Sequence, residues 1–410
     1  MNDYSLSALS KLVFFSLLVS IVAIASRSVV VCRVCVFFVL GLCIYLGRRE
    51  PKFFNPFFLF ALTPFSLLIY TNLSDSIMMD LNHDTWVIAI INMFAFIVAV
   101  YYSIIRTKDG RVHEGQTADN LGNHALLLIL LYSVASLYQL IASKTLAVSS
   151  VFLVCGIPAI ICALKSRKIL IIIFVVAVYF LLALDTMSKA SILRIAITIM
   201  IGYEMLYPST KMQRRVIYIL TGASVVLLVA SFAFGLKGKN QTNAEERKEK
   251  YEVSYGLTWD SSAELIGPYA YMTTPWANLQ YVMETQGNEH TDGLWLVRPV
   301  LGYLQIDEKY KKEYTLIPYS SFNTYTFIAV QYKDFGLYLS IISSILIGLF
   351  VGRYYRRCLT TNSPLEIASY VLTAQATLMM FFSNHFFMLS YPFTIVLAMW
   401  IYKNIFGYRI

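Results

Sequence analysis

Residues 86–105 read WVIAIINMFAFIVAVYYSII, twenty residues without one charged side chain. A helix needs about 20 mainly apolar residues to cross the hydrocarbon core of a bilayer. Comparable stretches recur along the chain, which is 58% hydrophobic and only 14% charged, whereas soluble domains carry roughly 25% charged residues. The sequence therefore predicts an all-α, polytopic integral membrane protein.

Eleven further apolar stretches accompany this one. They cover residues 12–26, 29–46, 53–70, 124–142, 148–164, 169–184, 190–206, 216–236, 336–352, 366–382 and 387–405. The sequence thus predicts about twelve transmembrane helices: nine in residues 1–236 and three in residues 336–410. Residues 237–335 separate the two groups, and we call them the cap.

The placement of lysine and arginine in short loops predicts the orientation. Three occur in each of the loops 48–52, 106–111, 165–168, 211–215 and 353–357, and two more in the C-terminal tail. The alternate short loops from residue 71 onward hold only Lys144 and Lys189. Basic residues in short loops stay on the cytoplasmic side. Both termini are therefore predicted to be cytoplasmic, and the cap to face the periplasm or the cell exterior.

The cap is too long for a simple connection, because structureless loops beyond about 12–15 residues are uncommon. It is also too rich in aromatic residues for a typical disordered segment. Trp259, Trp276 and Trp295 are interleaved with tyrosines and lie near Asp260, Glu264 and Asp292. Flat aromatic faces beside carboxylates suit sugars. The alternative is an aromatic belt at the membrane interface.

Two basic features on the outer side are candidates for binding an anion. Arg298 lies in the apolar run LWLVRPVL, residues 294–301. A guanidinium in such an apolar setting needs an anionic or carbonyl-rich partner. A lipid-linked diphosphate is one candidate, and an internal carboxylate such as Asp260, Glu264 or Asp292 is the alternative. Lys189 and Arg194 form the second feature, at the start of a helix whose backbone N–H groups also favour an anion. A local pair between Asp185 and Lys189 is the alternative.

Several common chemistries lack their motifs. The five histidines show no metal-ligand spacing, and His83 and His290 are expected to be ordinary loop histidines. No glycine-rich nucleotide motif and no hydrolase motif occurs. No cofactor, no metal and no nucleic-acid partner is therefore predicted.

Two patches carry a resemblance to a known family. Residues 321–327 read SFNTYTF, and residues 332–336 read YKDFG and lead directly into an apolar helix. This arrangement after a long outer loop resembles the bacterial O-antigen polymerases, the Wzy-type oligosaccharide repeat-unit polymerases. The segment TMSKAS, residues 186–191, is similar to a short serine–basic motif of that family. The plan of twelve helices with one large late loop is similar along the whole chain.

The resemblance implies a fold and an activity. The protein would be a GT-C-like, metal-independent glycosyltransferase of lipopolysaccharide biosynthesis in the bacterial inner membrane. It would join undecaprenyl-diphosphate-linked oligosaccharide repeat units at the periplasmic face, without nucleotide-sugar. Its partners would be the lipid-linked oligosaccharide, membrane lipids, a chain-length regulator and a flippase.

The resemblance also suggests roles for individual residues. Arg298, Lys189 and Arg194 would bind diphosphate. Asp334, Tyr325 and Asn323 would position the acceptor or shape the site. One carboxylate among Asp260, Glu264 and Asp292 would act as base, with Trp259, Trp276 and Trp295 contacting sugar. Asp334 has a simpler alternative role as a carboxylate at a helix N-terminus.

Three other functions stay open. A lipid-linked-oligosaccharide flippase also has about twelve helices, but transporters place charged or broken helices near the midplane, and charge is sparse there in this sequence. The related O-antigen ligases usually carry histidine where this chain has Phe322, which argues against a ligase-like enzyme. A structural protein of envelope assembly is the third alternative.

Overall fold

The computed structural model describes residues 5–72, 81–107, 118–142, 155–185, 189–207, 263–286, 290–291, 293, 325–361, 363–382 and 386. All regular secondary structure within these residues is helical. Five of the helices described are long and apolar enough to cross a membrane: Leu6–Ser26, Val29–Arg49, His83–Arg106, Asp119–Tyr138 and Phe327–Thr361. The chain is therefore a helical membrane protein. The helices predicted over 216–236 and 387–405 lie outside the described residues.

The chain forms two compact units. Unit 1 comprises Met1–Thr107, Val229–Arg353 and Ala376–Leu389, and unit 2 comprises Lys108–Leu228, Tyr354–Gln375 and Ser390–Ile410. Each unit is a set of segments that pack against one another, and the division says nothing about which segments lie in the membrane. The predicted separation of membrane helices from a cap, with boundaries at residues 237 and 336, stays a prediction.

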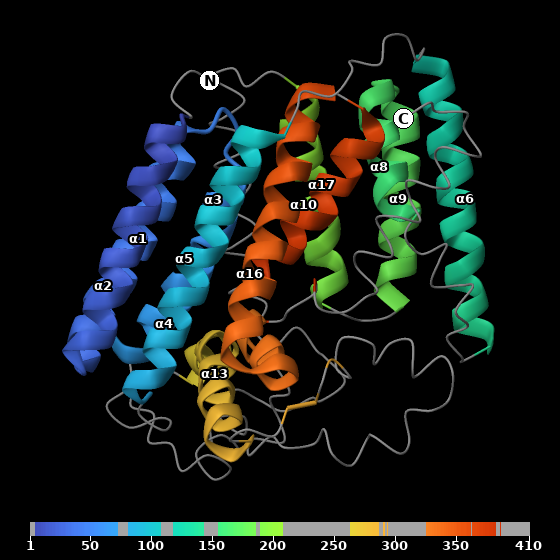
Figure 1. Cartoon of the computed structure of the whole chain (residues 1–410). Coiled ribbons are helices and arrows are strands. Elements are labelled where there is room, and N and C mark those ends of the chain that lie inside the picture. The colour runs from blue at the N-terminus through green and yellow to red at the C-terminus, as the bar shows by residue number, and fades with distance from the viewer. Residues whose placement is uncertain are drawn as a thin grey trace. The chain divides into compact units, whose positions relative to one another are not determined.

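Unit 1 is built around α5 (His83–Arg106), which packs against α1 (Leu6–Ser26) and α2 (Val29–Arg49) (Figure 1). In its most apolar window α5 is 72% buried, against 22% for α1. Its core side chains include Trp86, Met93 and Phe96, none of which has exposed surface. The outward face of α1 instead leaves large apolar side chains exposed, as expected for a helix that borders lipid.

A proline divides the third predicted helix, residues 53–70, into two. α3 (Pro56–Phe60) begins at Asn55, whose side-chain oxygen accepts hydrogen bonds from the N–H groups of Phe57 and Phe58. α4 (Leu62–Asn72) follows after Ala61. Pro64 has no N–H to donate to the carbonyl of Phe60, so the hydrogen-bond ladder is interrupted there.

Two glycines bring α16 (Phe327–Thr361) close to α5 within unit 1. A Cβ atom on Gly348 would lie 2.6 Å from the carbonyl oxygen of Phe96, and one on Gly352 would lie 2.6 Å from that of Val100. Spacing of four residues places both glycines on one helix face, the small-residue packing found between membrane helices. The Ser103 hydroxyl adds a 2.6 Å hydrogen bond to the carbonyl of Leu349.

α16 differs most from the sequence expectation. The sequence predicts a helix over 336–352, whereas helical structure begins at Phe327 and is broken at Gly336, with φ 70° and ψ −168°. The predicted helix start is thus the position of the break. The nine residues before it, assigned to the cap, form a separate helical segment that is largely buried.

Unit 2 contains α6 (Ala118–Ala142), α8 (Gly156–Ser166), α9 (Ile169–Asp185), α10 (Lys189–Leu206) and most of α17 (Pro364–Leu378). A buried hydrogen bond of 2.7 Å from Gln375 Nε2 to Thr198 Oγ1 links α17 to α10. An ion pair of 3.0 Å between Arg357 and Glu366 ties the start of α17 to the end of α16. Residues 148–154 of the predicted sixth helix lie outside the described part of the chain.

Candidate functional site

One end of unit 1 gathers segments that are far apart in sequence. α13 (Ala263–Gln286), a helix of the cap, packs there against α4 and the start of α5 (Figure 1). The imidazole Nε2 of His83 lies 2.9 Å from the carbonyl oxygen of Ala23 at the end of α1. We call this the α13 end of unit 1. The loop charges predict that these same segments share one side of the membrane.

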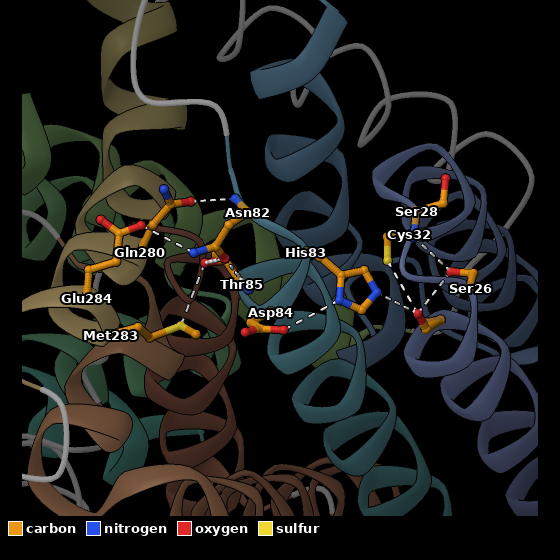
Figure 2. Close-up of polar contacts among 11 residues, drawn as sticks. Ser26, Ser28, Cys32, Asn82, His83, Asp84, Thr85, Gln280, Met283 and Glu284 are labelled. Carbon is orange, nitrogen blue, oxygen red and sulfur yellow. Dashed lines mark hydrogen bonds and ion pairs between the residues drawn. The ribbon is translucent and has the colours of Figure 1, made fainter.

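Asn82 is the main polar connection between α5 and α13 (Figure 2). Its side-chain oxygen accepts a 2.9 Å hydrogen bond from the N–H of Thr85 and so caps α5. Its backbone N–H donates to Gln280 Oε1 at 2.7 Å, and its Nδ2 donates to Glu284 Oε1 at 3.2 Å. One residue therefore begins a membrane helix and holds the cap helix against it.

Asn82→Ala is expected to lower the free energy of unfolding by about 1–2 kcal/mol, since it removes a helix cap and the bond to Glu284. Asn82→Ser is the matched control, because serine also caps helices but is too short to reach Glu284. Thermal unfolding in detergent, followed by tryptophan fluorescence, measures both. Equal losses of stability in the two variants would show that the hydrogen bond from Thr85 to residue 82, which caps α5, contributes little.

Two consecutive ionisable residues, Lys333 and Asp334, are buried just before the break in α16. Asp334 has no exposed surface, and Lys333 is 2% exposed. Thr291 donates a hydrogen bond from its hydroxyl to the Asp334 carboxylate. Its backbone N–H also donates to the carbonyl of Lys333 at 3.1 Å. Burial of ionisable groups is costly, so this arrangement is typical of a functional site.

Two glycines allow the cap segment and the broken helix to approach each other. A Cβ atom on Gly336 would lie 2.6 Å from Nε2 of His290, and a Cβ atom on Gly293 would lie 3.2 Å from the ring of Phe335. Both glycines have positive φ, 70° and 85°, which other residues rarely adopt. The rings of His290 and Tyr332 also meet edge to face, with centroids 6.0 Å apart. Residues 290, 291 and 293 are therefore fitted closely to the helix break.

The segment before Gly336 folds back along the helix that follows it. Ser344 is thirteen residues after Gln331, yet its hydroxyl lies 3.1 Å from Gln331 Oε1. In an unbroken helix thirteen residues span about 20 Å. The Ser344 hydroxyl also lies 2.7 Å from Asn92 Oδ1 in α5, and Asn92 Nδ2 lies 3.4 Å from Ser340 Oγ. Buried amide and hydroxyl side chains therefore lie between the segment before Gly336, the helix after it and α5.

The structure brings together only part of the predicted site. Asp334 lies at the helix break, and Tyr325, 7% exposed, precedes the same helix. Lys189 and Arg194 lie on α10, and Glu264 on α13, but the structure does not describe their side chains. The other predicted residues lie outside the described part of the chain: Arg298, Asn323, Trp259, Trp295, Asp260 and Asp292.

Trp276 has a packing role in the described structure. Its indole is fully buried, and Nε1 donates a 2.9 Å hydrogen bond to Ser66 Oγ in α4. A ring without exposed surface offers no face on which a sugar can stack. Its predicted contact with sugar stays a prediction, and it requires α13 to separate from α4.

Several residues at the site were not singled out from the sequence. Lys333 stood within the YKDFG stretch, next to Asp334, without an assigned role. His290 was expected to be an ordinary loop histidine, and Thr291 carried no signal at all. The one sequence feature that could have indicated the site is the presence of Gly293 and Gly336 near these polar residues, because glycine allows two backbones to approach closely.

Comparison with family models, curated proteins and solved structures gives no significant match. The functional assignment therefore depends on the residues themselves.

Proposed function

We propose that the protein polymerises undecaprenyl-diphosphate-linked oligosaccharide repeat units at the periplasmic face of the bacterial inner membrane. The observation that supports this most is the buried Lys333–Asp334 pair at the break in α16. It lies within the YKDFG stretch on which the resemblance to the O-antigen polymerases depends. The proposal includes a GT-C-like arrangement of about twelve helices with both termini in the cytoplasm.

Glycosyl transfer from a lipid diphosphate needs both a negatively charged group near the acceptor hydroxyl and positively charged groups near the diphosphate. The bond from the donor sugar to its lipid diphosphate breaks, and a bond to an acceptor hydroxyl oxygen forms while that hydroxyl loses its proton. Asp334 is fully buried against Thr291, so Thr291 must move aside before the carboxylate can orient the acceptor hydroxyl or receive its proton. Lys333 and the N-terminus of the helix after Gly336 are suited to balance charge on the departing diphosphate. Arg298, Lys189 and Arg194 would add further positive charge.

The broken helix also favours a second candidate, a flippase for the same lipid-linked oligosaccharide. Transporters often bind substrates where a membrane helix is interrupted and its backbone is exposed to a cavity. The sequence predicts that charge is sparse near the membrane midplane, and this stays a prediction; Lys333 and Asp334 are nevertheless two ionisable residues buried beside an interrupted helix. A glycosyltransferase remains the main proposal because Asp334 is bonded to Thr291 and both residues belong to the predicted cap.

Purified protein in proteoliposomes separates the two candidates. With a defined undecaprenyl-diphosphate-linked repeat and no nucleotide, a polymerase yields a ladder of longer glycans, resolved by gel. A flippase instead changes which leaflet exposes the single repeat to a lectin, without elongation. Arg298→Ala should lose the ladder but retain normal membrane insertion. Exposure of single repeats without any ladder would reject the polymerase proposal.

A further inference from the structure

An apolar groove of about 460 Å³ lies within unit 1, between α1, α5 and α16. Its lining includes Val13 and Leu17 of α1, Ala95 and Val98 of α5, and Ile341 and Ile345 of α16. Ligand sites for molecules of moderate size occupy roughly 300–1,000 Å³. The groove is therefore large enough for part of a lipid chain.

One end of the groove lies close to the break at Gly336, and the groove extends from there along α16. Its lining on α16 starts at Ile341, five residues after Gly336 and therefore about 7.5 Å along the helix axis. It continues to Leu349, about 12 Å farther along. A lipid with its headgroup at the break has its chain directed along this groove.

The chemistry of the lining selects hydrocarbon. Three side chains with hydroxyls, Ser16, Ser20 and Tyr102, are the polar members of the lining. The Ser16 and Ser20 side chains are themselves buried. A polar ligand there would lose its hydration without enough partners in return. Leu17 is 57% exposed, so this edge of the groove is accessible from the lipid phase.

We propose that the groove binds the polyisoprenyl chain of the lipid-linked substrate, an inference that rests on the proposed function. The groove follows the part of α16 after Gly336, and Lys333 and Asp334 come just before that glycine, so a single lipid can reach both. The chain then holds the diphosphate at the break while sugars reach the cap. An ordinary phospholipid carries neither a diphosphate nor an oligosaccharide, so it would fill the groove without supplying the groups that the break and the cap bind in this proposal.

A photoreactive lipid tests the proposal directly. The probe is undecaprenyl diphosphate with a diazirine in its chain, added to the full-length protein in nanodiscs and mapped by mass spectrometry. We expect labelling on α1, α5 and α16 at the groove, reduced by unlabelled undecaprenyl diphosphate and not by excess phosphatidylglycerol. Labelling elsewhere, or equal displacement by both lipids, would overturn the proposal.

Groove-filling variants provide a second measurement. Ala95→Trp and Val98→Trp should reduce labelling about tenfold, the factor that corresponds to the loss of a few buried methylene contacts. Val34→Trp is the control, because Val34 is 48% exposed on α2 and does not line the groove. Undiminished labelling in a folded groove variant would contradict the proposal. If neither variant folds, the competition between lipids in the wild-type protein decides.

The polymerisation assay is scored separately. Chain growth by a protein whose groove binds phospholipid and polyisoprenyl lipid equally would reject the groove proposal and leave the proposed function standing. Specific labelling of the groove without chain growth would support the groove proposal and reject the polymerase, and would leave the flippase as the next candidate to test.

Discussion

Asp334→Asn is expected to reduce glycan chain extension by about 100-fold or more, the lower end of what a positioned acid or base contributes. The substitution keeps the size of the side chain and its ability to accept a hydrogen bond from Thr291. It removes the negative charge that would receive the acceptor proton. The rate of ladder formation by purified protein measures the effect.

Asp119→Asn is the matched control for Asp334→Asn. Asp119 lies at the exposed start of α6 and pairs with Lys168, and exposed pairs contribute little to stability. The Asp119→Asn variant should polymerise repeat units at the wild-type rate. Wild-type activity in Asp334→Asn would remove Asp334 from the site. Loss of the protein from the membrane in that variant would instead give Asp334 a structural role.

Gly336→Ala is expected to destabilise the protein by about 3 kcal/mol, for two separate reasons. The backbone at φ 70° and ψ −168° is nearly restricted to glycine, and another residue there costs roughly 1–3 kcal/mol. The new Cβ would also lie 2.6 Å from Nε2 of His290. Thermal unfolding in detergent, together with the monodispersity of the extracted protein, measures the loss.

A double-mutant cycle separates the two reasons. In a His290→Ala background the steric conflict is absent, so the cost of Gly336→Ala should fall by about 1 kcal/mol, while the backbone strain remains. Gly41→Ala is the control, because a Cβ there meets no atom within 4 Å and alanine is favoured within helices. Strict additivity of the two substitutions would show that His290 does not restrict position 336.

Helix positions in this protein follow largely from local sequence. The expected helix 29–46 corresponds to α2, Val29–Arg49, and the expected helix 169–184 corresponds to α9, Ile169–Asp185. A helix satisfies its own backbone hydrogen bonds, so an apolar run of sufficient length is enough to predict it. Hydropathy did not predict the two helix interruptions, at Ala61 and at Gly336. It contains no information about a missing backbone N–H or an unusual φ angle.

The candidate site was predictable only in part. Asp334 was identified from its motif, but its burial and its partner Thr291, 43 residues earlier, were not. Asn92 stands in the apolar run 86–105 of the sequence, and only the fold places it beside Ser344, 252 residues away.

The sequence by itself determined that this is a helical membrane protein, where several of its helices lie, and that residues near 334 deserved a functional hypothesis. The tertiary structure decided that α16 folds back at Gly336, that the cap segment at Thr291 reaches Asp334, and that a hydrocarbon-lined groove begins nearby. The physical reason is the range of the interactions. Backbone hydrogen bonds within a helix join residues four apart, whereas the contacts that build the site join residues tens to hundreds of positions apart, and no local pattern encodes their partners.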